Sequence, residues 1–155
     1  MIKYILFTFF ALSSSMQAQA FGQNKVQYRD FEWNYIANPD YNFAVYYYGD
    51  QIELATYTME ESIKSYEQIS KHLRWPLKKP VSIIIYNSHN EFQQNNVVSV
   101  YMQEGILGVT ELYKNRVVMP FEGDYQEFRN TLHHELVHAM ICLLYTSPSP
   151  RDGLL

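Results

Sequence analysis

The sequence predicts an α+β domain in which helices pack on a small twisted mixed sheet. Two stretches, 51–74 and 124–141, carry apolar residues at steps of three and four, which is typical of amphipathic helices. Short runs rich in β-branched and aromatic residues lie before and between them, as expected of strands. The order of these elements (strand, helix, strand, short helix, hairpin, helix) favours a layered α+β arrangement.

The composition is that of a globular protein. Hydrophobic residues make up 47% and charged residues 18% of the chain, which excludes a disordered protein. A length of 155 residues is enough for one domain. The net charge is −4 and Lys and Arg form no cluster, so nothing indicates nucleic acid as a partner.

Residues 1–20 have the layout of a secretory signal peptide. Lys3 supplies a basic start, 4–12 form a compact apolar run, and Ala18-Gln19-Ala20 is a typical cleavage site. The apolar run is too short to cross a bilayer. We therefore expect an exported protein, periplasmic or extracellular, that begins at Phe21 and has no stable membrane span after cleavage.

Residues 142–155 are predicted to be a non-native tail. The run from Cys142 to Asp152 resembles the translation of a transposase-type sequencing adapter, and prolines at 148 and 150 prevent a helix from continuing. A native Pro-rich linker is the alternative. On the first interpretation, residues 21–141 are one small domain or the N-terminal part of a larger catalytic domain.

The N-terminal half of this domain is predicted to alternate strands with one long helix. A short strand is expected within 30–36, and the aromatic run 41–48 after the turn at Asn38-Pro39-Asp40 reads as another. The amphipathic helix 51–74 follows. It ends before Pro76, because the residue before a proline disfavours helical dihedral angles.

A central strand and a short helix come next. The run 81–86 is short and β-branched, which is typical of a strand in the middle of a sheet. Ser88 and Glu91 form a capping box that begins a helix reaching about residue 96. His89 lies in the first turn of that helix, where we expect a solvated side chain.

A hairpin leads into the last helix. The runs 109–113 and 116–121, joined by Lys114-Asn115, are typical of two antiparallel strands. Asp124 is a good N-cap for the helix 124–141. An apolar stripe is expected to face the core, and it consists of Tyr125, Phe128, Leu132, Leu136 and Met140.

The segment His134-Glu135-Leu136-Val137-His138 has HExxH spacing. Residues four apart lie on the same face of a helix, so His134 and His138 can hold one metal ion between them. Neutral imidazoles suit Zn²⁺. Glu135 is placed to act as a general base on a zinc-activated water, which predicts hydrolysis of peptide bonds. The alternative is a helix whose histidines are ordinary surface or core residues.

The stretch from about 107 to 141 resembles the N-terminal half of a zinc metallopeptidase of the gluzincin, peptidase MA-like type. The resemblance implies a zincin-like subdomain in which an edge strand lies above the zinc helix and pairs with an extended peptide substrate. That strand would supply Val109, Thr110, Glu111 and Leu112. The metzincin pattern fails, because positions 141 and 144 are Ile and Leu.

The resemblance also implies what this chain lacks. The third zinc ligand of the family is a Glu on a later helix, and relatives of the exported type often continue into a C-terminal domain. We therefore expect the full protein to be an exported zinc metallopeptidase acting on peptides or proteins, and this chain to be an inactive fragment. The alternative is a non-catalytic zincin-fold module that binds peptides or envelope proteins through its sheet edge.

Overall fold

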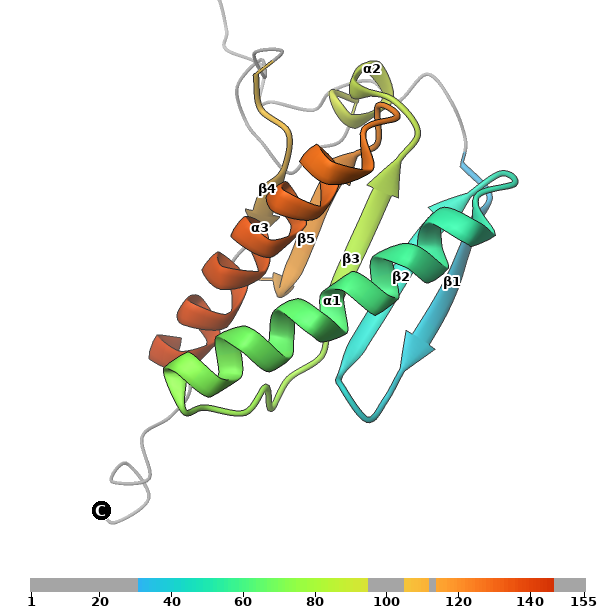
Figure 1. Cartoon of the computed structure of the whole chain (residues 1–155). Helices are drawn as coiled ribbons and strands as arrows, with labels where there is room; N and C mark the ends of the chain where they lie inside the picture. Colours follow the sequence, from blue (N-terminus) through green and yellow to red (C-terminus); the bar gives the residue numbers. More distant parts are fainter. Residues whose placement is uncertain (1–30, 95–104, 112–113, 147–155) are drawn as a thin grey trace, which may run out of the picture.

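The computed structural model describes residues 31–94, 105–111 and 114–146, and it confirms the α+β class (Figure 1). Its strands are β1 (Trp33–Asn38), β2 (Phe43–Tyr48), β3 (Val81–Tyr86), β4 (Val109–Glu111) and β5 (Arg116–Pro120). Its helices are α1 (Ile52–Leu73), α2 (His89–Phe92) and α3 (Tyr125–Thr146).

The strands form one mixed sheet in the order β1-β2-β3-β5-β4. The three inner strands are parallel to one another, and both outer strands are antiparallel to their neighbours. β3 lies in the centre, as the sequence predicts. β4 lies at one edge and pairs with β5, with Thr110 opposite Val117, so the predicted hairpin is confirmed.

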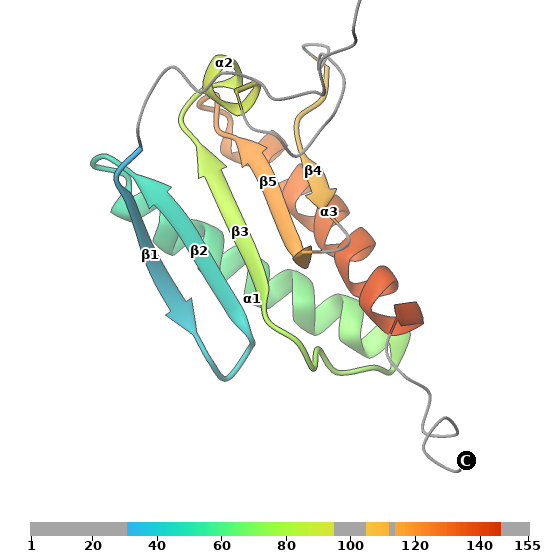
Figure 2. The same cartoon turned by 180° about the vertical axis from the view of Figure 1, so that it is seen from behind.

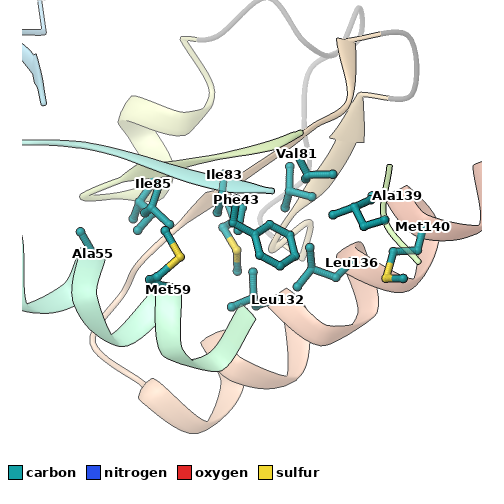
Figure 3. Packing of buried hydrophobic residues seen from close by; sticks show 14 of the residues in the cluster. Phe43, Ala55, Met59, Val81, Ile83, Ile85, Leu132, Leu136, Ala139 and Met140 are labelled. Carbon is teal, nitrogen blue, oxygen red and sulfur yellow. The ribbon is translucent and has the colours of Figure 1, made fainter. Parts of the chain in front are cut away.

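Both long helices cover the same face of the sheet, and the opposite face is seen in Figure 2. The main core lies between the sheet and these helices, because alternate residues of each strand point to one face. Figure 3 shows this packing for part of the cluster. The fully buried residues of this cluster come from the inner strands and the two helices. They include Val45, Leu54, Val81, Ile83, Val117, Met119, Leu132, Leu136 and Met140.

The last helix differs from its prediction at both ends. α3 continues to Thr146, beyond Ile141, and Leu143 is buried, because it extends the apolar stripe three residues after Met140. Tyr125 was expected in the core, but 48% of its surface is exposed. It lies in the first turn and packs instead at the rim, against the rings of Tyr57 and Phe121.

The prediction for His89 was wrong. α2 begins as expected, because the Ser88 hydroxyl accepts a hydrogen bond from the Glu91 amide at 3.3 Å. His89, however, is buried and packs against the ring of Phe92. The segment that follows β5 contacts this turn, since the Glu122 carboxylate accepts a hydrogen bond from the His89 amide.

The first strand lies slightly later than expected, at Trp33–Asn38 rather than within 30–36. The short helix α2 ends at Phe92 and is followed by a turn at Gln93 and Gln94, so it is shorter than the predicted helix, which reached about residue 96. Within the described part of the chain, no helix combines the length and the hydrophobicity needed to cross a bilayer.

Candidate metal centre

Helix α3 positions the candidate site. Its first turn is capped by Asp124, whose Oδ1 accepts hydrogen bonds from the amides of Gln126 (2.8 Å) and Glu127 (3.0 Å). Leu132 and Leu136 are fully buried against the sheet. Because these two residues fix the rotation of the helix about its axis, the positions between them have defined directions.

His134 and His138 lie one turn apart on the exposed face of α3. Their Nε2 atoms approach to 3.0 Å, and their ring centroids are 4.6 Å apart with the planes at 81°. Two nitrogens bound to one tetrahedral zinc at its usual bond length would lie about 3.3 Å apart. The separation of the two Nε2 atoms is therefore close to the one that a shared zinc ion requires.

Glu135 is placed differently from the histidines on either side of it. It is 9% exposed, because its side chain turns towards β4 rather than out into solvent. The Thr110 hydroxyl lies 2.5 Å from Glu135 Oε2 and 3.0 Å from the Glu135 main-chain oxygen. Within the described part of the chain, the hydrogen bond to the Glu135 carboxylate is made at Oε2, and none is seen at Oε1.

Two hollows border His134. One, of about 420 Å³, lies between α3 and the segment that enters β4, and it is lined by Gly105–Gly108, Asn130, Thr131, His134 and Glu135. The other, of about 630 Å³, lies between α1 and α3 and includes Glu61, Lys64, Arg129, His133 and His134. The first hollow is therefore bordered by His134 and Glu135 together, whereas His138 does not line it.

The predicted edge strand adjoins this site, but its residues are not equivalent. Thr110 faces α3 and contacts Glu135. Val109 packs on the opposite face of the sheet, against a second hydrophobic cluster that consists of Tyr48, Tyr86, Phe92 and Val118. Glu111 forms ion pairs with Lys114 (2.9 Å) and Arg116. Leu112 lies outside the described residues.

The electrostatics of Glu111 follow from these contacts. Burial acts to raise the pKa of the Glu111 carboxyl, but hydrogen bonds from Lys114 and Arg116, and their charges, outweigh burial and hold the pKa below its ordinary value. Glu111 is therefore ionised at neutral pH and serves the hairpin rather than the site.

The described residues contain no group of three His, Cys, Asp or Glu side chains placed to hold a metal ion. His133 lines the hollow between α1 and α3 and does not join the pair. The contact between Thr110 and Glu135 was not predicted, because strand alternation shows only which face Thr110 occupies. In comparisons with known proteins, no protein-family model, no curated protein and no solved structure matches the chain.

Proposed function

We propose that this chain is the N-terminal part of an exported zinc-dependent metallopeptidase. The observation that supports the proposal most is the 3.0 Å approach of the His134 and His138 Nε2 atoms, next to the largely buried Glu135 carboxylate.

The residues divide the chemistry between them. His134 and His138 would hold Zn²⁺, which when bound lowers the pKa of a coordinated water to about 7 and polarises a carbonyl. Glu135 Oε1 can accept the proton of an attacking water and return it to the leaving amine. Thr110 engages Oε2, so the two carboxylate oxygens have separate tasks.

The edge strand β4 suits an extended peptide. Among the described strands, only β5 pairs with β4, so the outer main-chain groups of Val109–Glu111 face away from the sheet. Such an edge can pair with a peptide by strand addition. The adjoining hollow of about 420 Å³ would then receive a substrate side chain beside His134.

The test uses the full-length protein that contains this chain, assayed on a mixture of peptides with and without a chelator. We expect hydrolysis that stops with the chelator and returns with zinc. Glu135→Gln should lower kcat by about 10²- to 10⁴-fold, the usual contribution of a general base, while zinc content stays unchanged. Glu127→Gln is the matched control, because Glu127 is an exposed glutamate in the first turn of the same helix.

Hydrolysis that persists in the chelator or in Glu135→Gln would refute the proposal. Zinc-independent peptide binding without hydrolysis would instead identify the domain as a peptide-binding module that uses its sheet edge.

A further inference from the structure

We infer that Thr110 is a positioning residue that fixes the carboxylate of Glu135, and that Gly108 makes the room for it. This inference rests on the proposed function, in which Glu135 is the general base. It assigns to the edge strand a second task besides pairing with the peptide.

The hydrogen-bond geometry is the first observation. Thr110 Oγ1 lies 2.5 Å from Glu135 Oε2. The Thr110 hydroxyl donates to this carboxylate oxygen, and the contact is short for a hydrogen bond between two oxygens. The same hydroxyl lies 3.0 Å from the Glu135 main-chain oxygen. The hydroxyl has one proton, which these two acceptors share, so Thr110 contacts both the backbone and the side chain of Glu135.

The second observation is the space at Gly108. A Cβ atom at this position would lie 3.0 Å from Glu135 Cγ and 3.0 Å from Thr131 Cγ2. Contacts this short require a neighbour to move. Gly108 has no positive φ, so its role is to leave space rather than to allow an unusual backbone conformation. The Glu135 stem occupies the volume that a side chain would need.

Strand alternation connects the two observations. Residues two apart on an extended chain face the same side, so Gly108 and Thr110 both face α3, and Val109 between them faces the other side of the sheet. β4 and the residue just before it therefore supply the hydroxyl and the gap next to Glu135. The proposed peptide-pairing edge and the proposed base are thus in direct contact.

The first measurement is made on this 155-residue chain without metal, at pH 7, by NMR. The couplings between Hα and Hβ of Glu135 and its carboxyl-carbon shift report whether the side chain keeps one rotamer. We expect one rotamer in the native chain and in Thr110→Ser, which keeps the hydroxyl. We expect averaging among rotamers in Thr110→Val, which has the same shape without the hydroxyl. Thr56→Val is the control, because the exposed Thr56 hydroxyl bonds only to its own helix, at Ile52.

A second variant covers the case in which Thr110→Val does not fold. Gly108→Ala keeps the hydroxyl but crowds the Glu135 stem, so it should move Glu135 to a different rotamer. If the signals of Glu135 stay unchanged in every variant that folds, the positioning role is wrong.

The second measurement separates this inference from the proposed function. In the full-length protein, Thr110→Val should lower kcat by about 10- to 100-fold, as loss of a supporting hydrogen bond does in metal sites, and leave KM within about twofold, with Thr110→Ser restoring kcat. An unchanged kcat would overturn the positioning role. If the full-length protein hydrolyses nothing while the rotamers change as expected, the proposed function fails and the contact between Thr110 and Glu135 stands.

Discussion

His134 and His133 are adjacent in the sequence but occupy different surroundings. His134 meets His138 through the Nε2 atoms on the exposed face of α3, whereas His133 is turned by about 100° around the helix axis and lines the hollow towards α1. At the scale of single residues, the spacing of four positions is therefore what brings the two proposed ligands together.

This difference predicts which histidines bind zinc in the chain itself. His134→Ala and His138→Ala should each abolish zinc binding, because one remaining imidazole cannot chelate. His133→Ala should keep the native affinity. Isothermal titration with zinc measures all three variants, and equal losses from His133→Ala and His134→Ala would contradict the shared site.

The hairpin of β4 and β5 is the element that carries Thr110 to the site. Its far end is fastened by the Glu111 carboxylate, which pairs with Arg116 and Lys114. The lowered pKa of Glu111 means that the folded hairpin favours the charged form. This ion pairing therefore adds stability above the ordinary pKa of 4.5 and loses it as the pH falls through the lower folded-state value.

Glu111→Gln tests this element. At pH 7 we expect the variant to unfold with a free energy lower by about 0.5–1 kcal/mol, the range for partly exposed ion pairs. The difference should vanish as the pH falls below 4.5. Urea denaturation of both proteins at a series of pH values measures it. A difference that is constant across the series would show that the charge of Glu111 plays no part.

The described residues form two main layers, a sheet and a pair of long helices, and the main core lies between them. Leu143 belongs to this core with 2% exposure, although it lies within the stretch predicted to be a non-native tail. The origin of residues 142–155 stays a prediction. Whatever that origin, burial of Leu143 stabilises this chain.

Leu143→Ala should therefore lower the free energy of unfolding by about 2–5 kcal/mol, as removal of a buried leucine side chain usually does. Tyr145→Ala is the control, because Tyr145 is 82% exposed on the same turn of α3 and its loss should change stability by no more than about 0.5 kcal/mol. Chemical denaturation compares the two variants. Equal effects would show that the end of α3 does not pack on the core.

Much of the secondary structure could be predicted from local patterns. The steps of three and four residues in 51–74 and 124–141 report which side of a helix is buried, and that information is contained within each segment. The errors arose at positions where residues of other segments decide how deeply a side chain is buried. His89 was expected in solvent and Tyr125 in the core, and both predictions were wrong, because the first packs against Phe92 and the second lies at the rim of the helix layer.

The sequence by itself determined the helix, its cap and the pairing of His134 with His138, because a helix turns by a fixed angle per residue and four positions return to the same face. Only the tertiary structure decided the burial and the hydrogen-bond partner of Glu135. Its burial and its partner depend on Gly108 and Thr110, which lie more than twenty positions earlier and meet α3 because the order of strands places β4 at the adjoining edge of the sheet. The spacing of apolar residues within one segment does not contain that information, since a contact between distant segments exists only after both have packed on the same core.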